Sequence, residues 1–301
     1  MGKHNFPAVL AENLWVLGNY YFNLYLVQGN NASALIEVGI SAITDTVISQ
    51  LDSLNISPDY LVVPHPHTDH ITGLQGLRQR FPDAIPIFGQ GAQEFVSHPK
   101  ALGAMISEDQ FMAQMLSVKG IRPERPPIEN FYFPDDHIVA KDEYAVDLGG
   151  IVLNCMQAKG HSPGNIIVHI PDRRALILSD SLGFHFPDRC FLPLFFTGFS
   201  DYMKTLDCME ALNPRIIGLG HQGPLIDTDA ERAFYNSRQA TLNLYSTIIG
   251  RQKDKDDIAD EIFNTYYKDE FTIYSEKNIR NCARLLVRRA LELADRNEGN
   301  L

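Results

Sequence analysis

The chain has 301 residues, of which 45% are hydrophobic and 21% charged, values that suit a globular protein with a large buried core. Its formal net charge is −11. Because an acidic surface repels phosphate backbones, a general nucleic-acid-binding role is disfavoured and no nucleic-acid partner is expected.

Strands and helices alternate through the first half of the chain. Residues 14–39 are rich in Val, Leu, Ile and aromatic side chains and are punctuated by Gly and Asn, which predicts three short strands. Ser41 is then expected to cap a helix, because Ile43, Val47 and Leu51 recur on one helical face. The elements predicted next are a buried strand at 59–63, a helix at 74–81, a strand at 85–88 and Met-rich helical structure at 90–118.

A Pro-rich connector at 121–130 leads into a second run of strands. These are predicted at 136–140, 143–147, 151–157, 165–170, 175–179 and 215–218. Beyond about residue 228 the strand pattern fades, and helices are predicted at 230–250, 256–267 and 276–297. We therefore expect an α/β domain over residues 1–227 and a helical C-terminal extension over 228–301, which would serve as a lid or an oligomer surface.

The cysteines and the N-terminus are the features of the sequence that bear on the expected cellular compartment. Cys155, Cys190, Cys208 and Cys282 are far apart, as expected for free thiols in a reducing environment. The N-terminus has no apolar core of signal-peptide length, and no run of about 18 apolar residues predicts a membrane span. The expectation is a cytoplasmic protein with no membrane partner.

A cluster of histidines follows the predicted strand at 59–63. His65, His67, Asp69 and His70 lie within six residues, at the end of a buried strand and therefore at the rim of a sheet. The alternating His65 and His67 can bind one metal ion, and Asp69 and His70 can reach a second. Imidazole and carboxylate groups are the ligands expected for zinc, iron or manganese.

Three more potential ligands each follow a predicted strand or stand in a turn beside one. His161 lies in Lys-Gly-His-Ser-Pro-Gly, Asp180 ends the strand at 175–179, and His221 lies in Gly-His-Gln-Gly. A single Gly-His pair is usually only a turn, and a single Asp after a strand is usually a cap. The ordered set is far more specific, whereas His4, His98, His137 and His169 lack such a context and are expected to be surface or core residues.

The order HxHxDH, Gly-His-Ser, Ser-Asp and Gly-His resembles the metallo-β-lactamase superfamily over roughly residues 10–225. The resemblance implies an αββα sandwich with a two-metal site at one edge. It would assign His65, His67 and His161 to the first ion. Asp69, His70 and His221 would hold the second ion, with Asp180 bridging both. One departure is Glu37-Val38-Gly39, where the family usually has Asp-x-Gly; the glutamate is expected to accept backbone hydrogen bonds near the metal loop.

Substrate residues are sought in the loop at 184–199, which is rich in phenylalanine and follows Asp180. An apolar wall at this place suits an acyl chain or an aromatic group, and docking of the extension onto the core is an equal alternative. The candidates for contact with substrate are Phe184, His185, Phe195 and Tyr266. For Tyr266, as for Tyr267 and Tyr274 of the extension, core packing is the more common role. The extension also resembles, in layout, glyoxalase II-like thioesterases and the quinolone signal response protein.

The function expected from these residues is a hydrolase with two divalent ions, zinc, iron or manganese. A hydroxide bridging the ions would attack an ester, thioester or lactone of a small molecule, and Asp69 would also pass a proton to the leaving group. One alternative is a phosphodiesterase or nuclease of the same fold. Another is a regulatory or partner-binding protein with an incidental metal site. A homo-oligomer is a further expectation.

Overall fold

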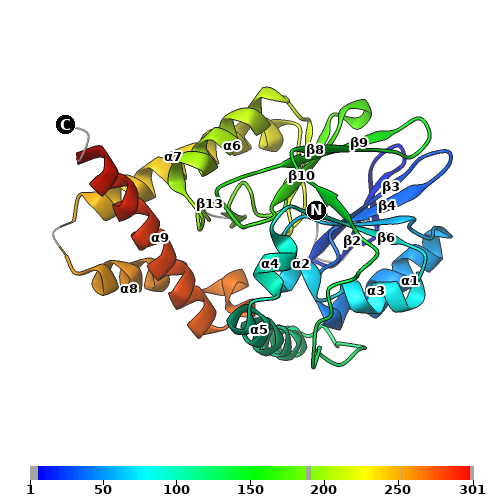
Figure 1. Cartoon of the computed structure of the whole chain (residues 1–301), viewed down its shortest axis with the longest axis horizontal. Coiled ribbons are helices and arrows are strands. Elements are labelled where there is room, and N and C mark those ends of the chain that lie inside the picture. Colours follow the sequence, from blue (N-terminus) through cyan, green and yellow to red (C-terminus); the bar gives the residue numbers. More distant parts are fainter. Residues whose placement is uncertain (1–5, 188–190, 252, 299–301) are drawn as a thin grey trace.

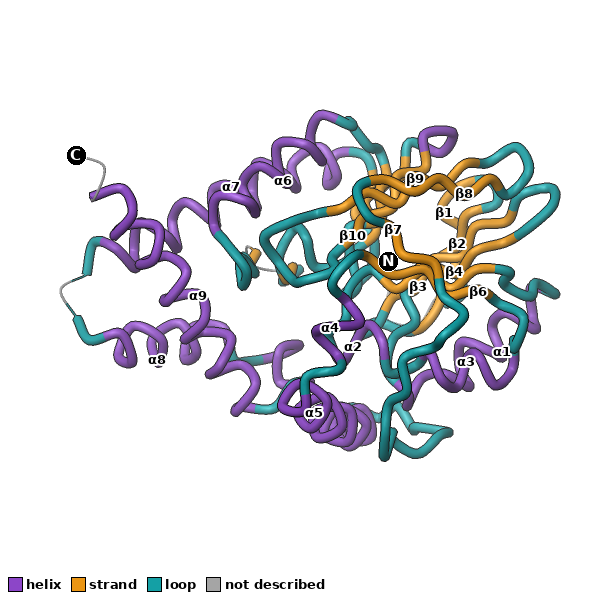
Figure 2. Tube along the Cα trace, viewed as in Figure 1, coloured by secondary structure: helices purple, strands orange, loops and turns teal. Residues whose placement is uncertain are grey.

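The computed structural model describes residues 6–187, 191–251 and 253–298. Two β-sheets face each other and helices lie against their outer sides, as Figure 1 shows. The C-terminal helices extend to one side of this block of strands (Figure 2). This arrangement confirms the predicted αββα sandwich with a C-terminal helical extension. The division at residues 227 and 228 stays a prediction, because one buried apolar cluster runs from the sheets into the extension.

The first sheet has seven strands in chain order. They are β1 (Ala8–Ala11), β2 (Leu14–Gly18), β3 (Asn23–Gln28), β4 (Ser33–Ile36), β5 (Tyr60–Val63), β6 (Ile85–Gly89) and β7 (Ile138–Ala140). The strands from β1 to β4 pair antiparallel, and those from β4 to β7 pair parallel. The three strands predicted within 14–39 are therefore β2, β3 and β4.

The second sheet has six strands in the order β15-β14-β11-β10-β9-β8. Their bounds are β8 (Glu143–Asp147), β9 (Val152–Gln157), β10 (Ile166–Ile170), β11 (Ala175–Ile177), β14 (Ile216–Gly218) and β15 (Leu225–Ile226). A separate hairpin consists of β12 (Phe184–His185) and β13 (Phe191–Leu192). The strands β11 and β14 pair in parallel, so the loops that follow them leave the sheet at the same edge.

The inner faces of the sheets form one core, and their outer faces form another. Val16 and Tyr25 point into the buried cluster between the sheets. Their neighbours Leu17 and Leu24 belong to the cluster under the helices. This alternation follows from the strand, in which successive side chains point to opposite faces.

Helices cover both outer faces. On the side of the first sheet these are α1 (Thr44–Leu54), α2 (Thr68–Ile71), α3 (Leu74–Arg80), α4 (Ala92–Val96) and α5 (Pro99–Val118). On the side of the second sheet α6 (Phe199–Ala211) is followed by α7 (Thr228–Ile249), and the chain ends in α8 (Lys255–Tyr266) and α9 (Glu276–Glu298). Short 3₁₀ helices are η1 (Ser41–Ile43), η2 (Pro171–Arg173) and η3 (Asp269–Ile273).

The expected cap of the first helix was wrong. Ser41 lies inside η1, and its hydroxyl donates to Asp109 at 2.5 Å instead of capping α1. The helical stretch predicted at 90–118 is broken at residues 97–98, where Pro99 begins α5. The predictions did not include β1, α6 or β15, of which β1 and β15 have only four and two residues. His4 and Cys190 lie outside the described residues.

Two neighbouring carboxylates of α5 connect distant parts of the fold. Asp109 accepts hydrogen bonds from Ser41, from the Thr72 hydroxyl at 2.6 Å and from the Ile128 amide at 2.9 Å. Glu108 accepts from the amide and the hydroxyl of Ser275, at 2.8 and 2.6 Å. One turn of α5 is therefore joined both to the segment after α2 and to the start of α9.

A search of the described helices for membrane spans identified none with sufficient length and apolar character.

Candidate metal centre

The site lies where parallel strands of both sheets end. In the first sheet β4 and β5 are parallel neighbours, so Glu37 and the loop from Pro64 emerge side by side. In the second sheet β11 and β14 are parallel neighbours, which brings the loops carrying Asp180 and His221 to a common edge. His161 lies in the turn between the antiparallel strands β9 and β10. The structure thus brings together all seven predicted ligand residues.

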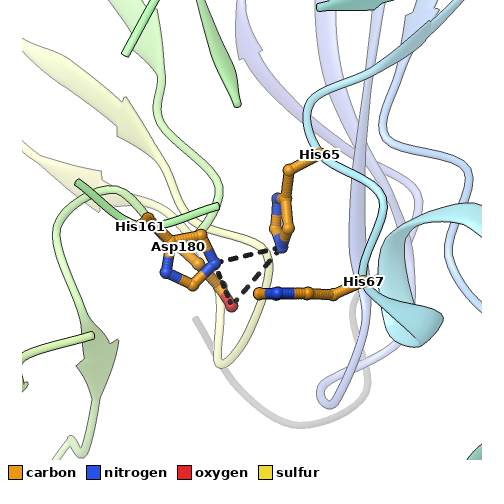
Figure 3. Close-up of side chains that lie close together, drawn as sticks. All are labelled: His65, His67, His161 and Asp180. Atoms are coloured by element: carbon orange, nitrogen blue, oxygen red, sulfur yellow. Dashed lines mark hydrogen bonds and ion pairs between the residues drawn. The ribbon is translucent and has the colours of Figure 1, made fainter. Parts of the chain in front are cut away.

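One group of potential ligands consists of His65, His67, His161 and Asp180, with ligand atoms within 4.8 Å of one another. His65 Nε2 lies 3.3 Å from His161 Nε2 and 3.9 Å from Asp180 Oδ2. In Figure 3 the three imidazole rings gather around the Asp180 carboxylate. The rings come from the loops after β5 and β9, and the carboxylate comes from the loop after β11.

A second group consists of Asp69, His70, Asp180 and His221, again with ligand atoms within 4.8 Å. Asp69 Oδ2 lies 3.2 Å from His70 Nε2 and 3.3 Å from His221 Nε2. Asp180 is common to both groups, as the predicted bridging role requires. Gly220 permits the close approach of this loop, because a Cβ there would lie 2.6 Å from Cε1 of His70.

In three of the rings, Nδ1, the nitrogen that points away from the cluster, contacts a hydrogen-bond acceptor. Nδ1 of His161 contacts the Leu194 carbonyl at 3.0 Å, and Nδ1 of His221 contacts the Tyr21 carbonyl at 2.7 Å. Nδ1 of His70 lies 2.9 Å from Glu37 Oε2. Since carbonyls and carboxylates accept hydrogen bonds, each Nδ1 carries a proton and each ring directs its Nε2 toward the cluster.

The carboxylates of the cluster favour positive charge near them, as the pKa shifts of its residues indicate. Burial lowers the pKa of His221, but hydrogen bonds with Asp180 and Asp69 outweigh burial and raise this pKa to about 9. Burial raises the pKa of Asp69 and of Asp180, yet the charge of His70 and contacts with His221 hold both pKa values well below their usual range. On the other side, burial lowers the pKa of His67 to about 3, so this ring is neutral and able to ligate.

These residues fit divalent cations. The buried Nε2 of His70 has no hydrogen-bond partner among the described residues, although the two carboxylates lie 3.2 and 3.5 Å away. The Nε2 atoms of His65 and His161 face each other at 3.3 Å. A cation would satisfy the unpartnered Nε2 of His70 beside its two carboxylates and the two Nε2 atoms that face each other. Histidines whose Nδ1 is hydrogen-bonded to an acceptor are also typical of metal sites.

Glu37 has a different role from the expected one. Its side chain, which is 1% exposed, accepts from the ring of His70 and from no backbone amide of the described residues. Its φ of 73° is in the left-handed region, which a non-glycine residue adopts at an energetic cost and which is common at functional sites. We infer that this conformation turns the longer side chain back toward His70.

Tyr274 also reaches the cluster, from the segment between η3 and α9. Its hydroxyl lies 2.8 Å from Asp69 Oδ2 and 3.2 Å from His221 Nε2. The sequence favoured a packing role for this residue, because nothing in its local pattern distinguishes it from Tyr266 and Tyr267. A contact between residues 205 positions apart has no local signal in the sequence.

His67 is the most exposed of the seven candidate ligand residues. Six of the seven ligand residues are buried, and His67 is only half-buried. The ring of His67 lies 5.9 Å from Phe95 and 6.2 Å from Phe196, which also lies 5.5 Å from the ring of His161. Neither phenylalanine was among the predicted substrate residues, although Phe196 belongs to the aromatic loop that the sequence indicated.

The four predicted substrate residues lie elsewhere around the cluster. Phe184 stacks on His221 at 5.3 Å and packs against Phe271 of the extension at 4.6 Å. Phe195 is fully buried. His185 and Tyr266 line a cavity of about 650 Å³ between α7, α8 and the hairpin, and none of the seven ligand residues lines this cavity. The contact of any of the four with substrate stays a prediction.

The roles proposed for the aromatic loop are therefore divided among its residues. Phe196 lies beside His67 and His161 and Phe184 beside His221, while Phe184 and Phe186 also dock the extension through Phe271. Of the described histidines that the sequence set apart, His98 caps α5, His137 contacts the Pro134 carbonyl and His169 lies on β10, and none belongs to either ligand group.

Residues 19–221 match the family model of the metallo-β-lactamase superfamily, and the chain belongs to this superfamily. It is 26% identical over 218 residues to a β-lactamase-like protein 2 homolog of Caenorhabditis elegans, covering 70% of this chain and 58% of that protein. It is 24% identical over 160 residues to a hydroxyacylglutathione hydrolase of Ruegeria pomeroyi, covering 52% of this chain and 47% of that enzyme. The chain thus spans about half the length of these two relatives.

Among solved structures, a metallo-β-lactamase family protein from Thermus thermophilus is similar, with a TM-score of 0.66 and 18% sequence identity. The likeness covers 97% of this chain and 95% of that one, and it shows a shared fold. Most members of the superfamily are metal-dependent hydrolases. Together with the His/Asp cluster, membership supports a site for divalent metal ions.

Proposed function

We propose that the chain holds two divalent ions and hydrolyses an ester, a thioester or a lactone of a small molecule. The observation that carries this proposal is the pair of four-residue ligand groups that share Asp180. Seven buried or half-buried ligands exceed what one ion needs, since a catalytic zinc ion takes about three protein ligands. Zinc, iron and manganese all accept this donor set.

Bound divalent ions lower the pKa of water to near neutrality and polarise a carbonyl oxygen, which makes a Ser or Cys nucleophile unnecessary. The residues of the chain would hold the ligand side chains in place and exclude water from the site. His65, His70 and His161 are each at most 1% exposed and keep their rings fixed. The hydrogen bonds and ion pairs of Asp69 among the described residues all use Oδ2. Oδ1 is therefore the oxygen that would take a proton from the attacking water and pass it to the leaving group.

The surroundings of His67 favour an acyl substrate over a phosphodiester. Phe95 and Phe196 flank this half-buried ring, and an apolar wall suits an acyl or aromatic group. The net charge of −11 works against a polyanionic substrate. The similarity to a hydroxyacylglutathione hydrolase also supports thioester chemistry. We propose that substrate approaches on this side, with its acyl group between the two phenylalanines.

The test combines metal analysis with a substrate panel. Protein stripped with a chelator and reloaded with zinc, iron or manganese is expected to hold two ions per chain. It should hydrolyse nitrophenyl esters, acyl thioesters or lactones and leave bis(nitrophenyl) phosphate almost untouched. Phe196→Ala should raise KM for long acyl chains without changing the metal content, and Tyr235→Ala, an exposed tyrosine of α7, is the matched control.

The outcomes separate the parts of this proposal. Phosphodiester turnover without acyl hydrolysis would replace the substrate class by that of a nuclease. Two bound ions without any turnover would favour a regulatory protein. A Phe196→Ala variant that behaves like the control would remove the proposed approach path.

A further inference from the structure

The hydroxyl of Tyr274 occupies a defined place in the second ligand group. It forms a triangle with Asp69 Oδ2 and His221 Nε2, whose sides measure 2.8, 3.2 and 3.3 Å. The ring is 6% exposed and lies edge-on to Phe184, 6.1 Å away. This residue is outside the region matched by the family model, which ends at residue 221.

Anchors on both sides of Tyr274 hold its backbone. The hydroxyl of Tyr267 donates to the Tyr274 carbonyl at 3.0 Å. The next residue, Ser275, donates twice to Glu108 of α5, and Asn278 Nδ2 donates to the same carboxylate at 3.2 Å. The position of the Tyr274 hydroxyl is therefore determined by the extension and by α5 together.

The direction of the hydrogen bond between Tyr274 and Asp69 follows from which of the two groups carries a proton. Ionised Asp69 can only accept, so the single O–H proton of Tyr274 goes to Oδ2 at 2.8 Å. His221 uses its Nδ1 proton on the Tyr21 carbonyl, which directs its Nε2 toward the cluster. The Tyr274 hydroxyl therefore fixes the rotation of the Asp69 carboxylate, and it does so from outside the ligand set.

We propose that Tyr274 is a positioning residue that holds Asp69 toward the second ion and so makes the affinity for that ion depend on the C-terminal extension. The inference rests on the proposed two-ion function. Hydrogen-bond partners of metal ligands typically contribute 10- to 100-fold to metal affinity, because they restrict the ligand to the binding orientation. The first group has no such dependence, since Tyr274 contacts none of His65, His67 and His161 among its described hydrogen bonds.

The experiment is a titration of the metal-free full chain with zinc against a chromophoric chelator, which yields two stepwise dissociation constants. Tyr274→Phe keeps the ring and removes the hydroxyl. It is expected to raise one of the two dissociation constants, that of the second ion, by about 10- to 100-fold and to leave the other within about twofold. Tyr245→Phe is the matched control, because its ring packs on Phe199, away from the ligands.

Three results would overturn the inference. The first is a Tyr274→Phe variant with both constants unchanged. The second is an equal weakening of both ions, which indicates a general structural effect. The third is a visible tyrosinate-to-iron(III) absorption band in the iron-loaded chain that Tyr274→Phe lacks, which would make Tyr274 a ligand. A wild-type chain that binds only one ion would contradict the two-ion function itself. The titration of the wild-type chain is enough to reveal that outcome.

Discussion

Replacement of Glu37 by glutamine tests how the cluster holds His70. Glu37 Oε2 and His70 Nδ1 are 2.9 Å apart, and both side chains are at most 2% exposed. Glutamine has the same shape and retains an acceptor oxygen, but it removes the negative charge. The change therefore isolates the charge of this contact from its packing.

The expected magnitude follows from the kind of hydrogen bond that is lost. Hydrogen bonds to charged groups contribute about 1.5–3 kcal/mol and neutral ones about 0.5–1.5 kcal/mol. The difference of about 1–1.5 kcal/mol is not reduced by solvent screening, because the contact is buried. Since about 1.4 kcal/mol corresponds to a tenfold change in binding, Glu37→Gln should weaken the ion held by His70 roughly tenfold.

The assay is again a stepwise zinc titration of the metal-free chain. Asp59→Asn is the matched control, since Asp59 accepts from the Ser33 amide at 2.7 Å in the same sheet and contacts no ligand. The reasoning would be refuted if Glu37→Gln bound the second ion with wild-type affinity. It would also be refuted if Asp59→Asn weakened binding to the same extent.

Three further predictions concern the ligands and the core. Asp180→Ala should lose at least one ion and most hydrolysis while circular dichroism stays unchanged, because both groups share this carboxylate; full metal content by elemental analysis would contradict it. His67→Ala should lose metal and His169→Ala should not, since His169 lies on β10 outside both groups; equal loss in the two variants would mean that the cluster is misassigned. Tyr25→Phe leaves the Leu219 carbonyl without its 2.7 Å partner and should lower the free energy of unfolding by about 1–3 kcal/mol in urea titrations, whereas no change would place water at that carbonyl.

The sequence was sufficient for the sandwich and for the residues that meet at its edge. Strand ends carry local signals: His65 follows a run of β-branched residues, and Asp180 and His221 each follow a short apolar strand. The order of these segments along the chain resembles the metallo-β-lactamase superfamily. That resemblance supplied the sandwich, the convergence at one edge and the division into two groups.

Contacts between distant segments could not be predicted in this way. The bond of Tyr274 to Asp69 depends on how the extension docks, and the bond of Ser41 to Asp109 overrides a local capping preference. Glu37 departs from the family pattern, and its contact with His70 depends on a left-handed backbone that no residue pattern indicates.

The paired carboxylates of α5 make the extension hard to remove. Loss of residues beyond 274 would strip the buried Glu108 of both hydrogen bonds from Ser275 and of the one from Asn278, and burial already raises the pKa of this carboxyl. The next residue, Asp109, holds Thr72, two positions after His70. A truncated chain would thus disturb the metal loop through α5 even if every ligand were retained.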